Sequence, residues 1–598
     1  MKRLLGAIRG MGRGLINAVA RFPLAVVCLA AAAGLACYVV SLQGSPDILI
    51  QKLLFTCLTG AFLGMAAQFC CERFERLASK RLLAYVAAAL LTGAYYLSLG
   101  SAPSIEFDVQ IRTLAAVFAM FCLSLYIPSW RGGYDFDSIA LIHCKAALTA
   151  GVYAAVLSAG CASILGTIDI LLFNINNEAY QYTMIIIWIL FAGLYYLSLL
   201  PRFNSAEDAD QEYCREAGDY PRFLEILISY IAIPLAAIYT LVLAAYFIKI
   251  LVTLHWPVGQ LGPMVLAYSA AGLVIYILAG RLENRAAVWY RQLFPKLLIP
   301  IVIMQLVSVG IRLNAFGITE SRYYVALFGI YALVCAVLLS VKPVARNRMI
   351  VLLAAVFAVV SIIPPVDAFN VSRTSQTARL EKMLQAEGVL VDGKIKPKAD
   401  VSMNLRMEAT DILRYLQNRK YTDEIPWLPA DFNIYKDMEK TLGFKTAYNT
   451  TQAAPAEHFY ASLDAEEELV DIAGYDVMVM IHSYRGQDKD DIKPVEFTVN
   501  DEKYRLSTTR ISQREVRVAV MDDKGRELVG TGLYSFVRSL RETEQPNVQL
   551  GPEQLTLKTE KDGYKLKIMF QSVNTEYENN DNIGADYDMW VFFSAPKP

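Results

Sequence analysis

Long apolar stretches, one after another, are the feature of this sequence that most restricts its possible folds. A helix that crosses the hydrocarbon core of a bilayer needs about 20 apolar residues. The first 365 residues contain such stretches with short polar connections, which predicts a multi-pass transmembrane bundle. The eleven segments are 22–42, 48–70, 82–100, 113–129, 146–172, 180–200, 224–253, 262–280, 294–312, 322–341 and 348–364.

The charged residues divide the chain at the same place. Residues 1–365 contain 26 Lys and Arg and 18 Asp and Glu, whereas the shorter part 366–598 contains 30 and 39. The formal net charge of −1 is therefore the sum of a positive charge on the membrane part and a negative charge on the soluble part. This division excludes a single soluble domain, a disordered chain and a nucleic-acid-binding protein with a dominant basic face. The second part has no cysteine, so its core forms without disulfides.

Loop charge predicts the orientation of the bundle, because cytoplasmic loops are enriched in Lys and Arg. With one helix across 139–173, the loops on the N-terminal side carry 21 Lys and Arg, and the opposite loops carry only Arg112, Arg312 and Arg322. Two helices there would remove this asymmetry, so the charges favour one. We therefore expect a cytoplasmic N-terminus and, after an odd number of spans, an extracytoplasmic C-terminal part.

The N-terminal residues 1–21 are basic and precede the first apolar stretch. That stretch, 22–42, is too long for the apolar region of a signal peptide, so we interpret it as a retained span. Residues 1–21 are then a cytoplasmic amphipathic segment on the membrane surface.

Two charged residues within the spans are candidates for function, because charges at membrane depth are costly. Asp169 and Lys249 are both predicted near the outer ends of their helices. They can form an ion pair. Alternatively, Asp169 caps its helix end and Lys249 extends its ammonium group to the interface.

The soluble part changes character along its length. Residues 366–450 have the spacing of helices, with Ser372 or Ser375 as the expected cap of the first one. Residues 451–598 alternate apolar and polar side chains, as strands joined by hairpin turns do. The predicted fold is a membrane all-α helical bundle of about eleven spans (22–365), followed by an extracytoplasmic α+β domain with an antiparallel β-sandwich-like part.

Motifs for catalysis or metal binding are missing from the sequence. It contains no HExxH, GxSxG, P-loop or Cys/His metal-ligand spacing. No catalytic residue, cofactor or metal is therefore predicted, and no nucleic-acid partner.

Two short elements carry a family resemblance: GITESRYY, which begins at Gly317, and AFNVSRTSQTARLEKML, which begins at Ala368. Together with the basic N-terminus and the number of spans, they resemble the bacterial domain-of-unknown-function 4153 family of multi-pass membrane proteins. The resemblance implies a protein of the bacterial cytoplasmic (inner) membrane and supplies no activity. It covers roughly residues 20 to 390.

Four charged residues in or beside these elements are predicted at the outer surface: Arg312, Glu320, Arg322 and Arg379. One hypothesis is an ion-paired hinge between the bundle and the soluble domain. The alternative is contact with lipid headgroups of the outer leaflet.

Three functions are compatible with this sequence. The first is a non-enzymatic envelope or sensory protein, whose outer domain binds a ligand, an envelope protein or a glycan, and which needs a separate cytoplasmic partner for any relay. The second is a transporter or flippase with a cavity in the bundle. The third is a membrane enzyme acting on lipid-linked envelope substrates, for which only Asp169, Glu320 and His255 lie near the outer face.

Overall fold

The computed structural model describes residues 2–596 apart from 43–45, 101–104, 106, 132, 174, 254–260, 342–346, 448–456, 464–471, 485–493, 513–514, 544–547 and 579–580. His255 therefore lies outside the described residues. The chain forms two compact units, Met1–Val401 with Ile412–Phe444, and Ser402–Asp411 with Lys445–Pro598. The boundaries predicted at residues 365 and 450 stay predictions.

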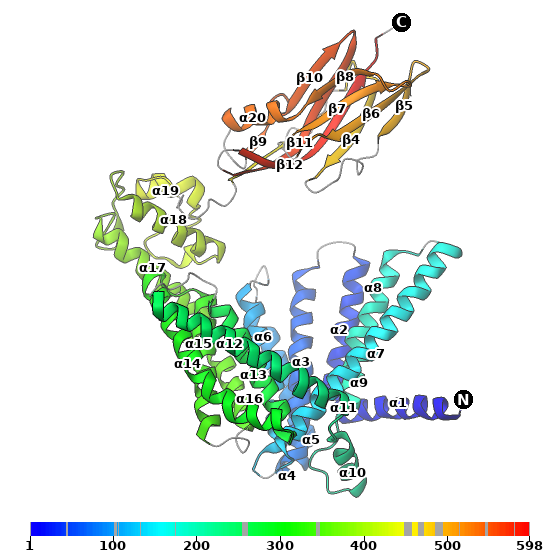
Figure 1. The fold of residues 1–598 in the computed structure, drawn as a ribbon, viewed down its shortest axis with the longest axis vertical. Helices are drawn as coiled ribbons and strands as arrows, with labels where there is room; N and C mark the ends of the chain where they lie inside the picture. Colours follow the sequence, from blue (N-terminus) through cyan, green and yellow to red (C-terminus); the bar gives the residue numbers. More distant parts are fainter. Residues whose placement is uncertain are drawn as a thin grey trace. The chain divides into compact units, whose positions relative to one another are not determined.

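The first unit is a multi-pass membrane bundle (Figure 1). Among the described residues, 10 helices are long and apolar enough to cross a membrane. The eleventh predicted span corresponds to α16, an apolar helix of only 14 residues. The helices that matter below are α2 (Pro23–Ser41), α3 (Ile48–Arg73), α5 (Arg81–Ser98), α6 (Phe107–Tyr126), α7 (Phe136–Leu171), α9 (Ala192–Ser198), α12 (Ile233–Thr253), α13 (Leu261–Leu278), α14 (Arg285–Phe316), α15 (Glu320–Val341) and α16 (Asn347–Val360).

Two helices of the bundle are continuous over their whole lengths. Residues 139–171 lie in a single helix, because α7 runs unbroken for 36 residues. Pro295 and Pro300 both lie inside α14, which stays helical through them. Neither site is therefore a break between two half-helices.

The bundle has two main apolar cores. One lies among α2, α3 and α9 and includes Phe22 and Phe69, and the other lies among α12 to α15 and includes Tyr276 and Phe294. The first turns of α7 contribute to both, since Ile139 packs in the first core and Leu141 in the second. Contacts between α6 and α16 form a smaller third core. Helices α6, α7 and α16 therefore join the two halves of the bundle.

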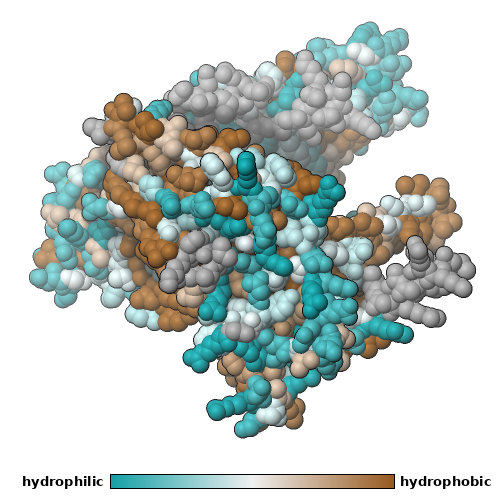
Figure 2. All heavy atoms as spheres, turned by 60° about the horizontal axis from the view of Figure 1, so that its bottom comes forward, coloured by the Kyte–Doolittle hydropathy of each residue, from teal (hydrophilic) through white to brown (hydrophobic). Residues whose placement is uncertain are grey.

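The N-terminal helix α1 (Lys2–Arg21) lies across one end of the bundle (Figure 1). Arg21 anchors it, because its guanidinium forms an ion pair with Glu72 of α3 at 2.6 Å. Figure 2 brings this end forward and shows hydrophilic side chains gathered over it, with hydrophobic side chains beside them on the flanks. That distribution is typical of a bundle whose sides face hydrocarbon.

Helix α17 (Ala368–Ala386) follows the last apolar helix, and with α19 (Ile434–Leu442) and the end of α18 (Met403–Asn418) it belongs to the first unit. The expectation of a cap at Ser372 or Ser375 was wrong. Asp367 caps α17, and its carboxylate accepts hydrogen bonds from the backbone N–H groups of Phe369 and Asn370. The helix therefore begins several residues earlier than its polar pattern suggested.

The second unit is β-rich and has its own apolar core. One sheet has the order β4–β12–β11–β3–β9, with β10 paired to β11, and the other has the order β5–β6–β7–β8. All described pairings are antiparallel except β3 with β9, which is parallel. Facing side chains such as Phe497 and Phe593 bring the sheets together. The strands are β3 (Glu457–Leu463), β4 (Val477–Ser483), β5 (Val495–Val499), β6 (Glu502–Arg510), β7 (Val516–Asp522), β8 (Glu527–Gly532), β9 (Val548–Leu550), β10 (Thr556–Lys561), β11 (Tyr564–Glu578) and β12 (Asp581–Ser594).

Candidate functional site: an apolar cavity in the bundle

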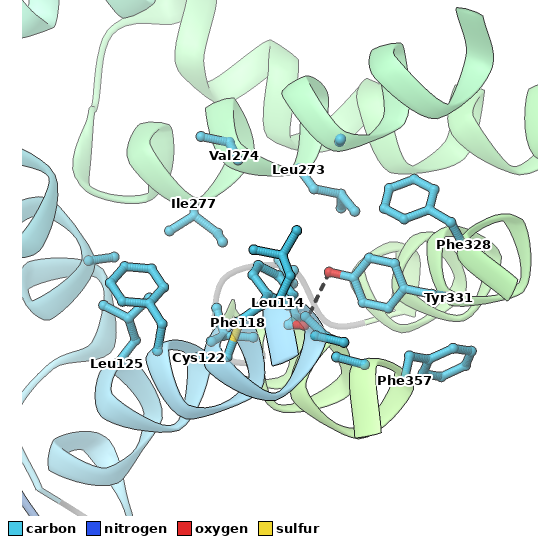
Figure 3. A pocket seen from close by; sticks show the side chains of 18 of the residues that line it. Leu114, Phe118, Cys122, Leu125, Leu273, Val274, Ile277, Phe328, Tyr331 and Phe357 are labelled. Atoms are coloured by element: carbon cyan, nitrogen blue, oxygen red, sulfur yellow. Dashed lines mark hydrogen bonds between the residues drawn. The ribbon is translucent and has the colours of Figure 1, made fainter. Parts of the chain in front are cut away.

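A cavity of about 810 Å³ lies where the two halves of the bundle meet. Its wall comes from α6, α7, α13, α15 and α16. Figure 3 shows Leu114 and Phe118 of α6 on one side, with Leu273 and Ile277 of α13 across the space from them. The volume falls within the range of small-molecule binding sites.

The wall of the cavity is almost entirely apolar. No Asp, Glu, Lys or Arg stands among the described residues that line it. Two of its hydroxyl groups are bonded to backbone oxygens: Tyr331 donates to Ile350 at 3.2 Å (Figure 3), and Ser361 donates to Ala358 at 2.7 Å. The cavity therefore offers hydrocarbon-like surroundings and almost no site for a charge.

The cavity extends along much of α6. Its lining begins at Ile111 and continues to Leu125 of the same helix. At a rise of about 1.5 Å per residue, this distance is about 21 Å. One leaflet contributes about half of a hydrocarbon core of about 30 Å. The lining is therefore longer than one leaflet is deep, which suits a long, narrow hydrocarbon chain.

His143 of α7 lies in the wall near one end of the cavity, here called the His143 end. The residue is only 3% exposed. Its Nδ1 lies 2.7 Å from the hydroxyl of Tyr196 on α9, and its ring stacks on Phe203 with 6.0 Å between centroids. Its Nε2 is buried and has no hydrogen-bond partner in the described part of the chain. One ring nitrogen is thus hydrogen-bonded within the described structure, and the other is not.

The opposite end is bordered by charged pairs and is here called the Glu320 end. Arg112, next to the cavity residue Ile111, forms an ion pair with Asp367 at 3.2 Å and lies over the ring of Phe369. Burial raises the pKa of Asp367, but hydrogen bonds from Asn370 and the charge of Arg112 outweigh it and hold the pKa below its usual value. This cap is therefore a carboxylate at neutral pH.

Glu320 begins α15 one turn before Tyr324, which lines the cavity. Its side chain is 5% exposed, and its Oε1 accepts a hydrogen bond from the Tyr421 hydroxyl at 3.1 Å and lies 3.6 Å from the Arg419 guanidinium. The Arg419 guanidinium also lies 4.3 Å from the ring centroid of Phe107 on α6. The buried carboxylate thus connects α15 with the segment that follows α18.

The two elements that carried the family resemblance contact each other directly. Ser375 accepts a hydrogen bond from the backbone N–H of Ile318 at 3.0 Å. The Gln376 amide donates to the carbonyl oxygens of Phe316 and Ile318 at 3.0 and 2.9 Å. Gly317 lies between them with φ of +69°, and a Cβ there would stand 2.8 Å from Gln376 Nε2. The turn thus requires glycine at this position. Its backbone groups form the hydrogen bonds to the side chains of α17.

The remaining predicted hinge residues surround the same turn. Arg322 donates hydrogen bonds to the carbonyl oxygens of Phe316 and Gly317 at 3.0 and 2.9 Å. Arg312 and Arg379 lie close enough to Arg322 to interact with it electrostatically. The ion-pair partner that the structure gives Glu320 is Arg419, a residue outside both elements. Glu320 was predicted because it lies in one of these elements, whereas its partner lies 99 residues further along the chain.

Asp169 and Lys249 lie away from the cavity and are not among its described lining residues. Asp169 accepts a hydrogen bond from the backbone N–H of Ile175 at 2.5 Å, just after α7 ends. Lys249 is exposed on α12, and no ion pair joins it to Asp169 in the described structure. Asp169 thus bonds to the backbone beyond the end of its own helix, and its role stays a prediction.

The basic loop residues have a local role that the charge count did not reveal. On the side of the bundle where α1 lies, many donate to backbone carbonyls where the helices end. Lys145 bonds Ala217 and Asp219, Arg73 bonds Trp130, and Arg348 bonds Ser129. Cations at such positions satisfy carbonyl groups that have no partner within their own helix.

The family model described as "Domain of unknown function (DUF4153)" matches residues 30–394. The chain belongs to this family. The match contains all helices that line the cavity and both elements around Gly317, so the cavity is part of the family domain. The β-rich unit follows the matched range.

A curated relative is an uncharacterised protein of Pasteurella multocida (strain Pm70), which is 21% identical over 349 residues. The matched region covers 56% of this chain and 58% of the relative, so the chain spans less than two thirds of that protein. No solved structure matches the chain.

Proposed function

We propose that this protein binds the hydrocarbon chain of a membrane amphiphile in the cavity of its bundle and acts as a non-enzymatic lipid-binding protein of the cell envelope. The cavity is the observation that supports this proposal. Its wall is apolar, it lies between membrane-spanning helices, and it follows α6 for about 21 Å. Lipid chains are the most abundant molecules with this shape and polarity in the surroundings of such a bundle.

The same wall favours binding over the other functions that the sequence allows. Moving a charged headgroup through the bundle requires polar or ionic groups along the path. The described lining has none of the four charged residue types. An enzyme acting on lipid-linked substrates needs clustered acids or bases, whereas Glu320 and Asp367 are already occupied by Arg419 and Arg112.

The orientation belongs to the proposal too. The loop charges support a cytoplasmic N-terminus in the inner membrane and an extracytoplasmic β-rich unit, which then meets envelope proteins or glycans. A relay of lipid binding to the cytoplasm would use a separate partner there. Cysteine labelling tests the orientation: on a Cys-free background, Ser535→Cys, an exposed residue of the β-rich unit, reacts with a membrane-impermeant reagent in intact spheroplasts. Reaction only after lysis contradicts it.

The binding proposal is tested with a photoactivatable C16 alkyl probe added to the purified protein in nanodiscs. We expect crosslinks to peptides of α6, α13 and α15 that line the cavity. Ala354→Phe places a ring into the cavity from α16 and should reduce these crosslinks at least about tenfold. The matched control is Val356→Phe on the same helix, because Val356 is 47% exposed and lies outside the described lining. Crosslinks confined to outward-facing residues, equal in both variants, contradict the proposal.

A further inference from the structure

A second pocket, of about 190 Å³, lies at the Glu320 end, where the first turn of α6 meets the start of α17 and the segment that follows α18. Its volume is below the range of drug-sized ligand sites, so it suits a compact polar group and not a chain. We infer that this pocket binds the phosphate of a phospholipid headgroup, which makes the bound amphiphile a phospholipid. The inference rests on the proposed binding of a hydrocarbon chain in the larger cavity.

The pocket and the cavity are lined by consecutive turns of the same helix. Phe107 and Asp108 of α6 line the pocket, and the lining of the cavity begins at Ile111, about 5 Å further along α6. The guanidinium of the next residue, Arg112, lies 5.2 Å from the ring centroid of Phe369, which also lines the pocket. A phospholipid joins its phosphate to its chains through a glycerol unit only a few bonds long. One molecule therefore has the reach to occupy both spaces.

The position of the pocket along α6 is that of a headgroup. This helix is long and apolar enough to cross a membrane, and Phe107 is its first residue. Its 20 residues span about 30 Å, which is about the thickness of the hydrocarbon core. The first turn of α6 therefore lies at the level of the headgroups, and the cavity from Ile111 onward lies at the level of the chains.

Arg419 is the lining residue that suits a phosphate best, because a guanidinium presents paired N–H donors that match two phosphate oxygens. Its side chain is 32% exposed, and its guanidinium lies over the ring of Phe107. Its Nε is 3.6 Å from the Glu320 carboxylate, which is beyond hydrogen-bond distance. Within the described structure the Arg419 guanidinium donates no hydrogen bond, and none of its nitrogens is buried without a partner. Its donors are therefore accessible to a ligand.

The charges around the pocket limit what it binds. Among the described residues that line it, Arg419 and Lys420 are cationic and Asp108 is anionic. Glu320 adds a second carboxylate beside Arg419, although its side chain is only 5% exposed. These carboxylates offset part of the positive charge. The pocket therefore suits a phosphodiester, with its single negative charge, better than a phosphate monoester with about 1.5 to 2 at neutral pH.

Two photoactivatable lipids with identical C16 chains, a phosphatidylglycerol and a diacylglycerol, test this inference on the purified protein in an uncharged maltoside detergent. We expect the phosphatidylglycerol to bind the wild-type protein about tenfold more tightly, as measured by titration of the crosslinks to cavity peptides. Inorganic phosphate should displace it no more than sodium chloride of equal ionic strength does.

Variants of Arg419 assign the preference to this residue. Arg419→Gln should abolish the preference and leave the binding of diacylglycerol unchanged. Arg419→Lys keeps a cation beside Glu320 but loses the paired donors, so the preference should fall part of the way. The matched control is Arg414→Gln, which removes an arginine of α18 that is exposed and lies outside the described linings of pocket and cavity, and the preference should persist.

Equal binding of both lipids to the wild-type protein contradicts the headgroup site and leaves chain binding intact. A preference that persists in Arg419→Gln contradicts it too. If inorganic phosphate removes the preference, the pocket takes free phosphate and the assignment to a phospholipid is wrong. If neither lipid crosslinks to cavity peptides, chain binding itself is wrong. The comparison within the wild-type protein needs no variant, so it decides even if Arg419→Gln fails to fold.

Discussion

The two ends of the cavity hold polar groups in opposite ways. At the Glu320 end, buried carboxylates are paired with arginines and hydrogen-bonded to tyrosine and backbone groups, as Glu320 is with Arg419 and Tyr421. At the His143 end, a neutral aromatic side chain is packed among phenyl rings, and one of its nitrogens has no partner in the described structure. The first arrangement connects helices, whereas the second leaves a buried ring nitrogen unpaired among the described residues. Polar groups at the first end are therefore stabilised by charged partners, and the histidine at the second end by the packing of its ring.

The largest expected effect is on stability at the Glu320 end. Glu320→Ala removes the partner of Arg419 and the acceptor of Tyr421, and should lower the free energy of unfolding by about 3 kcal/mol. Glu320→Gln retains an acceptor for Tyr421 and should cost less. Denaturant unfolding in detergent measures both. His143→Phe should change the same quantity by less than about 1 kcal/mol, and an equal loss at both ends would contradict the comparison.

A smaller effect, which depends on pH, is expected at Asp367. Its folded-state pKa lies below the ordinary value, because hydrogen bonds from Asn370 and the charge of Arg112 outweigh the effect of burial. The carboxylate therefore contributes stability that is complete above the unfolded-state pKa of about 3.9 and is lost as the pH falls through the lower folded-state pKa.

Two substitutions separate the charge of Asp367 from its capping role. Asp367→Ala should lower the free energy of unfolding at neutral pH by about 1–2 kcal/mol. Asp367→Asn keeps a good capping side chain, so it should lose less at neutral pH and show a weaker decline in acid. Thermal unfolding followed between pH 3 and 7 measures this. An acid decline in Asp367→Asn as steep as in the wild-type protein assigns the decline to other groups.

The smallest expected effect is a gain in stability. Lys420 follows the C-terminus of α18 and has a φ of +56°. Residues other than glycine adopt this left-handed backbone conformation at a cost in free energy. Lys420→Gly should raise the free energy of unfolding by about 1 kcal/mol. Lys420→Ala is the control, since it removes the same charge without relieving the backbone. A gain in both variants attributes the effect to charge and not to conformation.

Helix positions were predictable to a large extent, because the length of an apolar segment and the polar residues that border it are local properties of the sequence. The apolar segment 322–341 corresponds closely to α15 (Glu320–Val341), and α18 (Met403–Asn418) lies within the range 366–450 that was predicted to be helical. The cap of α17 was not predictable in this way. Serine is a common helix-capping residue, but the Ser375 hydroxyl accepts a hydrogen bond from the backbone N–H of Ile318 in a distant turn. A tertiary partner thus replaced the local one.

Sheet pairing shows the same limit. The hairpin strands β6 and β7 alternate clearly and are joined by a short connection, so their pairing is visible in the sequence. The parallel pairing of β3 with β9 joins residues 461–463 to residues 548–550, and no local sequence pattern predicts it. A three-residue strand such as β9 exists only because its partner satisfies its backbone hydrogen-bonding groups.

The candidate site was the least predictable part. Asp169 and Lys249 attracted attention because charges in apolar segments are rare, yet the cavity lies elsewhere and is lined by residues that look like ordinary packing side chains. His143 was not singled out, because a lone histidine near a helix start has many explanations. Only the described surroundings show that one of its nitrogens is bonded and the other is not.

The sequence by itself determined that this chain is a multi-pass membrane protein followed by a β-rich unit, because burial in hydrocarbon depends on the length and polarity of each segment taken alone. Only the tertiary structure decided where the cavity lies and which polar atoms are close to it. Those features depend on how side chains from α6, α7, α13, α15 and α16 fill the space between the helices, and that packing is a property of five distant segments together.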